Sequence, residues 1–244
     1  FAGIISRSPL GVTRTLQKFR IGEVSLISLI IFVILAVFII AGVVAIQQGT
    51  RKIPVQYAKR VVGRKMYGGH STHIPLKVNQ AGVIPVIFAI SLLQFPLTIT
   101  YFFPPNAFTA FVQKYLSPTG NPGVWIYSIL YVILIIFFTY FYTAITFNTV
   151  EVADNMKKNG GFIPGIRPGK PTSDYLNKVL SRITLAGAIF LAVIAVLPTI
   201  LLHFTSLQLH FGGTSLLIAV GVALETMKQI EAQMLMRNYQ GFLK

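Results

Sequence analysis

Long apolar runs without Lys, Arg, Asp or Glu constrain the fold of this chain more than any other feature. Residues 24–46 form one such run, and residues 183–224 form another. A helix that crosses a bilayer needs about 20 mostly apolar residues. Only 11% of the residues are charged and 54% are hydrophobic, whereas a soluble domain has about 25% charged residues. The sequence therefore predicts an all-α polytopic membrane protein.

Five complete membrane spans are predicted, with a partial helix before them. The run that ends at residue 224 is too long for one span, and the stretch HFTSLQLHFGG divides it. The third span has Trp125 near its start and Tyr140 near its end, as expected for residues at a membrane interface. Residues 1–6 are expected to be the tail of a helix whose beginning is missing, so the chain is expected to be a fragment. The predicted spans are 24–46, 80–102, 124–147, 183–202 and 212–235.

Basic residues are concentrated in every second segment between the spans. Segments 48–77, 147–182 and 226–244 hold 16 of the 21 Lys and Arg residues, and the alternating segments hold 5. Cytoplasmic loops of membrane proteins are enriched in Lys and Arg. The sequence therefore predicts a multi-pass protein with cytoplasmic loops 48–77 and 148–182 and a cytoplasmic C-terminus.

Two predicted spans contain glycine and proline, which are unusual in a helix interior. Proline removes a helix hydrogen bond, and a membrane helix tolerates this only where neighbouring groups satisfy the freed carbonyl. Ordinary kinks in a packed bundle explain the pattern, and so does a helix that moves or lines a cavity. The residues are Gly82, Pro85 and Pro96 in span 80–102, and Gly187 and Pro198 in span 183–202.

The sequence lacks the residue patterns of enzymes and ion-coupled carriers. None of the six acidic residues is expected in mid-span, where a carrier usually needs ionisable groups. The chain has no cysteine, and His70 and His73 have no acidic neighbour to complete a metal site. We therefore expect no catalytic residue, no metal and no cofactor.

The loop 51–78 carries seven basic residues and no acid. Such a loop is suited to lipid headgroups or RNA phosphates, or it serves only to set the membrane topology. Apolar and basic residues alternate in IPVQYAKRVV. This alternation indicates a strand or an amphipathic projection.

The stretch NGGFIPGIRPGKP surrounds Arg167 with residues that restrict or free the backbone. Gly160 and Gly161 permit positive φ, whereas Pro164, Pro168 and Pro171 hold φ and favour extended residues before them. A guanidinium held in this way suits a carboxylate, a phosphate or the carbonyl groups of a partner. Alternatively, Arg167 caps the nearest helix C-terminus.

Four sequence blocks carry a family resemblance: IPVQYAKRVVGRKMYGGHSTHIPLKVNQAGVIPVIFA at 53–89, FNTVEVADNMKKNGGFIPGIRPGKPT at 147–172, RITLAGAIFLAVIAVLP at 182–198 and FGGTSLLIAVGVALETMKQIEAQMLMRNY at 211–239. They resemble the SecY family, the channel subunits of the bacterial Sec protein translocase. With FAGIISR at the start, the resemblance covers nearly the whole chain. Thr149 and Val150 replace more polar residues of the family pattern, and 101–122 has no clear family pattern.

The resemblance implies the C-terminal half of a pseudo-symmetric ten-helix channel, from the end of helix 5 through helix 10. Spans 80–102 and 124–147 would form one side of a lateral gate that admits signal sequences to the lipid. Ile87 and Ile218 would belong to the apolar ring that narrows the pore. The implied lateral gate residues are Pro85, Ile87, Ser91 and Phe95.

The resemblance also implies a function and a set of partners. The protein would move unfolded secretory proteins across the bacterial plasma membrane and membrane proteins into it, driven by the SecA ATPase or the ribosome. Its partners would be SecE, SecG, SecA, the ribosome, signal sequences, translocating polypeptides and anionic phospholipids. A secondary transporter with broken helices and a membrane-anchored RNA-binding protein are the alternatives. The implied SecA and ribosome docking residues are Lys59, Arg60, Arg64, Lys65 and Arg167.

Overall fold

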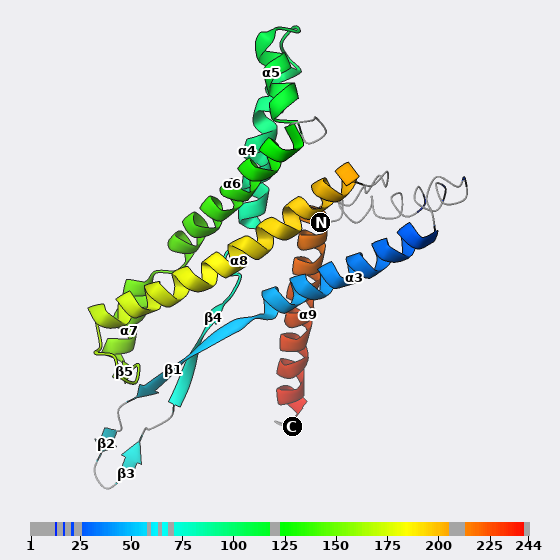
Figure 1. Cartoon of the computed structure of the whole chain (residues 1–244). Coiled ribbons are helices and arrows are strands. Elements are labelled where there is room, and N and C mark those ends of the chain that lie inside the picture. The colour runs from blue at the N-terminus through cyan, green and yellow to red at the C-terminus, as the bar shows by residue number, and fades with distance from the viewer. Residues whose placement is uncertain are drawn as a thin grey trace.

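The structure is a computed structural model, and the part of the chain it describes is mostly helical (Figure 1). It describes residues 26–57, 60–62, 65–67, 71–117, 123–204 and 213–241, with Thr13, Gln17 and Ile21. The helices are α3 (Leu26–Gln48), α4 (Ile84–Thr100), α5 (Ala107–Tyr115), α6 (Gly123–Thr146), α7 (Thr149–Lys158), α8 (Lys170–Phe204) and α9 (Gly213–Gly241). The strands are β1 (Thr50–Tyr57), β2 (Arg60–Val62), β3 (Lys65–Tyr67), β4 (Ser71–Lys77) and β5 (Gly161–Phe162).

Each of the five predicted spans overlaps a long helix: α3, α4, α6, α8 or α9. Among the described residues, the helical stretches Gly123–Lys158 and Lys170–Leu197 are long and apolar enough to cross a bilayer. Two shorter apolar helical stretches are Ala36–Gln48, the second part of α3, and Ile84–Thr100, which is α4. The count of five complete spans therefore stays a prediction.

The fold is not wholly α-helical, because the predicted loop 48–77 contains strands. β1 pairs with β4 in an antiparallel hairpin that joins Thr50 to Lys77, and β5 pairs with the other edge of β1. β2 and β3 form a separate two-stranded ladder. The alternation in β1 explains the sheet: Ile53 and Val55 are buried, whereas the residue between them is exposed.

Helix α8 begins at Lys170, well before the start of the predicted span 183–202. The charged residues of this stretch conceal an apolar stripe at helical spacing. Leu176 is fully buried, and Val179 and Ile183 pack partly buried beside it. These positions meet the hairpin residues in a small core, so the first turns of α8 support the sheet. The buried members of this core are Ile53, Val55, Leu76, Met156, Ile163 and Leu176.

A larger apolar core joins the long helices. α6 packs against α8 along much of its length, α4 packs against α6, and α3 lies beside α9 (Figure 1). Helix α8 continues through Gly187 and Pro198 without interruption. The fully buried members include Val43, Val86, Ala89, Ile135, Leu191 and Leu217.

Gly187 allows α8 to approach the end of the hairpin closely. A Cβ atom at this position would lie 2.7 Å from the carbonyl oxygen of Val78. Val78 is itself tied to the start of the hairpin, because its N–H donates to the carbonyl of Gly49 at 2.9 Å. The contact is with backbone, so it is not relieved by rotation of a side chain.

Gly187→Ala is therefore expected to lower the free energy of unfolding by about 1–3 kcal/mol, the usual cost of overpacking a core. The matched control is Gly42→Ala in α3, where the new Cβ would lie 3.4 Å from the Phe190 ring, an ordinary contact. Both variants gain about the same helix propensity. Thermal unfolding of the purified proteins in detergent is the measurement. Equal stability of the two variants would contradict the close packing at Gly187.

Candidate functional site

The N-terminal end of α4 departs from the expectation of a bend at Pro85. Gly82 has φ +65°, a conformation that favours glycine, and the helix begins two residues later. Pro85 lies in the first turn, where a missing N–H costs no helix hydrogen bond. Its role is to start the helix, and only Pro96 lies within it.

Helix α4 has a packed face and an open face. Three of the four predicted gate residues, Ile87, Ser91 and Phe95, follow one another at intervals of four residues and are all exposed. The Ser91 hydroxyl donates to the carbonyl of Ile87 at 2.7 Å, so its polar group is satisfied within the helix. The fourth, Pro85, lies on the packed face. The buried residues of α4 are Pro85, Val86, Ala89, Leu93 and Thr100.

The two predicted ring residues lie on two helices whose neighbouring residues come close at one point. Val83, one turn before Ile87, has a methyl carbon 3.6 Å from where a Cβ on Gly221 would lie. Gly221 is three residues beyond Ile218 in α9. Ile87 is 43% exposed and Ile218 is half-buried. Each therefore lies about one turn from the contact between Val83, just before α4, and Gly221 of α9.

The two predicted cytoplasmic loops form one unit, which we call the basic projection: β1, β4, α7, β5, the turn 163–169 and the first turns of α8 up to residue 182. The two loops are connected by strand pairing between β1 and β5, in which Gln56 pairs with Phe162 and Tyr57 with Gly161. A Cβ on Gly161 would lie 3.0 Å from the Tyr57 ring. Gly161 therefore serves close approach rather than positive φ, which Gly160 adopts instead.

Arg167 is exposed at a turn whose backbone is held by hydrogen bonds. Gly165 and Gly169 on either side have φ +81° and +100°. The hydroxyl of Thr172, a side chain only 1% exposed, donates to the carbonyl of Arg167 at 2.9 Å. The N–H of Ile166 donates to the carbonyl of Ile163 at 3.0 Å.

The guanidinium of Arg167 makes no hydrogen bond or ion pair with any described residue, so the helix-cap alternative finds no support in this part of the chain. Sequence reasoning did not single out Thr172. The available signal was a threonine in the first turn of a helix that follows a turn rich in glycine and proline.

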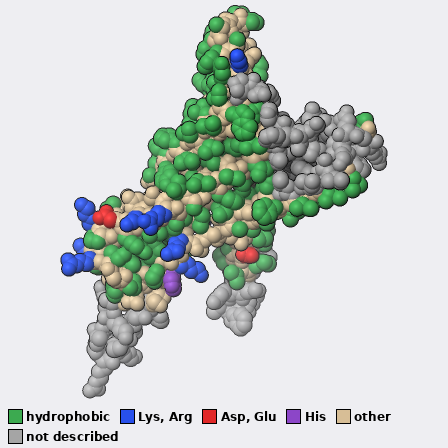
Figure 2. Space-filling model, in the orientation of Figure 1, with side chains coloured by type: hydrophobic (Ala, Val, Ile, Leu, Met, Phe, Trp, Pro, Cys, Tyr) green, Lys and Arg blue, Asp and Glu red, His purple; other side chains and the backbone are tan. Residues whose placement is uncertain are grey.

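Cations dominate the surface of the basic projection. Its described residues include nine exposed Lys or Arg side chains and three exposed acids, Glu151, Asp154 and Asp174. Figure 2 shows the blue side chains gathered where α7 and the start of α8 lie, whereas the surface over α4, α6 and α8 is largely green. The nine are Arg51, Lys52, Lys77, Lys157, Lys158, Arg167, Lys170, Lys178 and Arg182.

The side chains of the other four predicted docking residues are not described. Lys59 and Arg64 are outside the described residues. Arg60 and Lys65 belong to the β2–β3 ladder, of which only the backbone is described. Of the two histidines considered as metal ligands, His73 is exposed on β4 and His70 is outside the described residues.

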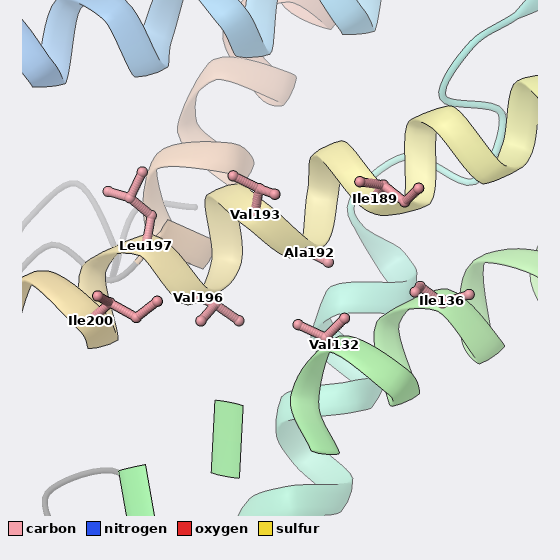
Figure 3. A pocket seen from close by; sticks show the side chains of 8 residues that line it. All are labelled: Val132, Ile136, Ile189, Ala192, Val193, Val196, Leu197 and Ile200. Carbon is pink, nitrogen blue, oxygen red and sulfur yellow. The ribbon is translucent and has the colours of Figure 1, made fainter. Parts of the chain in front are cut away.

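A groove of about 480 Å³ lies between α6 and α8 (Figure 3). All of its lining side chains are aliphatic, so it offers no group for acid–base chemistry and no contact for a charged ligand. The lining residues are Val132 and Ile136 from α6, and Ile189, Ala192, Val193, Val196, Leu197 and Ile200 from α8.

Comparison with known proteins places this arrangement in a family. The SecY family model matches residues 1–227. The chain belongs to the SecY family. SecY of Mycobacterium tuberculosis (strain ATCC 25618 / H37Rv), a protein translocase subunit, is 59% identical over 220 residues, covering 86% of this chain and 49% of that protein. SecY of Thermus thermophilus is 45% identical over 244 residues, covering all of this chain and 55% of that protein.

This SecY-family chain thus spans about half the length of the relatives it matches. Solved structures show the same fold at low sequence identity. One from work on the plug domain of the SecY protein has a TM-score of 0.57 at 19% identity and covers 95% of this chain and 57% of that one. A structure of a protein-conducting channel has a TM-score of 0.58 at 18% identity and covers 91% of this chain and 53% of that one.

Proposed function

We propose that this chain forms part of a SecY-type channel that conducts unfolded proteins across a bacterial plasma membrane and releases membrane proteins into it. The family match along residues 1–227 is the observation that carries the proposal. The family consists of translocation channel subunits and not of catalytic proteins, so the chain is proposed to have no enzymatic activity of its own.

Helix α4 is proposed to be a wall of the pore and the lateral gate. Its open face presents Ile87, Ser91 and Phe95, while its other face packs in the apolar core. A helix with one unoccupied apolar face is suited to receive another apolar helix, such as a signal sequence. Ile87 and Ile218 are proposed as the contribution of this chain to an apolar ring that resists ion flow and still widens for a polypeptide.

The basic projection is proposed to bind the SecA motor and the ribosome. Its exposed cations and the fixed turn at Arg167 support electrostatic docking to acidic protein surfaces or RNA phosphates. A fold neighbour, the yeast Ssh1 complex, was determined bound to the yeast 80S ribosome. SecE, SecG and anionic phospholipids complete the proposed partners.

Reconstitution tests the channel against a secondary transporter, the alternative from the sequence. No Lys, Arg, Asp, Glu or His is buried among the residues whose side chains the structure describes, which favours the channel because carriers usually need ionisable groups at membrane depth. The full-length protein would be co-purified with its small-subunit partners and placed in vesicles with SecA and ATP. Protection of a secretory protein inside the vesicles is expected. Saturable uptake of a small solute, without protein transport, would reject the proposal.

The proposed orientation gives a separate prediction, since the charge distribution places the basic projection in the cytoplasm. The chain has no cysteine, so a single cysteine at Ser71, Asn159 or Gln113 is the only thiol within these 244 residues, and the unsubstituted protein gives the background. An impermeant thiol reagent added to intact cells is expected to label position 113 and not positions 71 and 159. All three side chains are exposed, so labelling differences reflect the membrane. The reverse pattern would invert the topology.

A further inference from the structure

The segment between α4 and α6 presents an aromatic surface that no described residue covers. It contains six aromatic side chains within residues 101–115. Five of these are at least 54% exposed, and they are separated from the candidate gate face by the end of α4. A soluble monomer rarely leaves so large an apolar surface in water. The five are Tyr101, Phe102, Phe103, Phe108 and Phe111.

Helix α5 holds part of this surface in a defined orientation. The side-chain oxygen of Asn106 accepts from the Thr109 N–H, and the Thr109 hydroxyl accepts from the Asn106 N–H, both at 2.9 Å. This reciprocal cap determines where the helix begins. Thr109 and Val112 are buried, so one side of α5 faces the body of the protein.

The exposed aromatic residues lie beside that buried side. At about 100° per residue, Phe108, Phe111 and Tyr115 form a narrow arc, which we call the aromatic stripe. The rings of Phe111 and Tyr115 are in contact, with centroids 4.8 Å apart. Gln113 lies on the opposite side of the helix from the stripe, and it is exposed. Helix α5 is therefore amphipathic across its exposed surface.

A single charge accompanies the stripe. Lys114 is the only charged residue between positions 101 and 117. Its ammonium nitrogen lies 5.4 Å from the centre of the Tyr115 ring. A lysine beside aromatic rings reaches outward to phosphate while its carbon chain covers apolar surface. Phenylalanine, tyrosine and lysine in this arrangement are typical of helices that lie in a membrane interface.

We propose that α5 lies in the interface of the phospholipid bilayer, with the aromatic stripe among the upper acyl chains and Lys114 at the lipid phosphates. The inference rests on the proposed membrane placement of α4 and α6, because α5 is joined to the ends of both. The positive charge and the absence of any acid within residues 101–117 fit phospholipid phosphates. Gln113 faces water.

Spin labels at single cysteines test the proposal in the full-length protein. Phe108→Cys, Phe111→Cys and Gln113→Cys would be labelled and reconstituted in vesicles of phosphatidylethanolamine and phosphatidylglycerol. Collision rates with oxygen, which is enriched in lipid, and with a water-soluble nickel chelate would be measured. The oxygen-to-nickel ratio is expected to be several-fold higher at positions 108 and 111 than at 113. All three side chains are exposed, so the substitutions leave the core intact.

A label at Ile133, an exposed position in the middle of α6, separates this inference from the proposed function. A high ratio at 133 with equal, low ratios at 108, 111 and 113 would overturn the interfacial helix alone. Low access of both reagents at 108 and 111 would mean that protein covers the stripe, and would also overturn it. A water-accessible position 133 would overturn the membrane placement and this inference together.

Discussion

Arg167→Glu is expected to reduce SecA-driven translocation roughly 10- to 100-fold per folded channel and to leave thermal stability unchanged. A charge-assisted hydrogen bond contributes about 1.5–3 kcal/mol, and the reversed charge adds repulsion. The side chain is exposed and has no partner among the described residues, whereas the backbone of its turn is held by Thr172. The substitution therefore removes a group offered to a partner without disturbing the fold.

Two further variants separate the effect of the planar guanidinium from the effect of net charge. Arg167→Lys keeps the charge but loses the planar set of donors, so an intermediate defect indicates paired contacts with a carboxylate or phosphate. Lys228→Glu reverses an exposed charge on α9, outside the basic projection, and controls for net charge. Equal amounts of each reconstituted channel would be compared for translocation and thermal unfolding. Normal translocation by Arg167→Glu, or a loss of stability that accounts for its defect, would reject the docking role.

Asn at either proposed ring position is expected to raise the ion leak of the closed channel several-fold. An apolar constriction resists ions because water is unfavourable in it, and an amide side chain at Ile87 or Ile218 removes part of that barrier. Secretory proteins with weakly hydrophobic signal sequences are also expected to pass more readily. Neither isoleucine is fully buried, so the change costs little packing.

Conductance of single channels in planar bilayers, together with export of a weak signal sequence, measures this effect. Ile87→Val is the matched control, since it keeps the site apolar and removes one methylene. Leu92→Asn tests position, because Leu92 is another exposed residue of α4. Unchanged leak and unchanged signal stringency in both Ile87→Asn and Ile218→Asn would show that the ring assignment is wrong.

Apolar periodicity and charge were sufficient to predict the helices that lie in charge-free stretches. The predicted runs 24–46 and 124–147 each overlap a long helix, α3 and α6, to within two residues at either end. A search for runs without charges misses a helix that has one face in water, because charged residues on that face interrupt the run. The first turns of α8 are such a helix. There Asp174 and Lys178 are exposed while Leu176 is buried. The sequence blocks also predicted the family that the comparison confirmed.

Other features depended on contacts between residues far apart in the chain. The alternation around Ile53 indicated a strand, but no local pattern says that β1 pairs with β4 on one edge and with β5 on the other. Pro85 looked like a kink, and only the position of the first helical turn shows that it starts α4. Asn106 and Phe111 lie in the segment 101–122, which has no clear family pattern, so the helix cap and the aromatic stripe were not predicted.

The sequence by itself determined that this chain has apolar helices, a surplus of cations in alternate segments and a stiff turn at Arg167. These are properties of residue type and short-range spacing, and φ restriction by proline acts within one residue. Tertiary structure alone decided that the Arg167 turn and the basic hairpin form one unit. That union is made by backbone hydrogen bonds between positions 56–57 and 161–162, and by the space that Gly161 leaves for the Tyr57 ring. Backbone groups are alike in every residue, so their long-range pairing depends on where the whole chain places them.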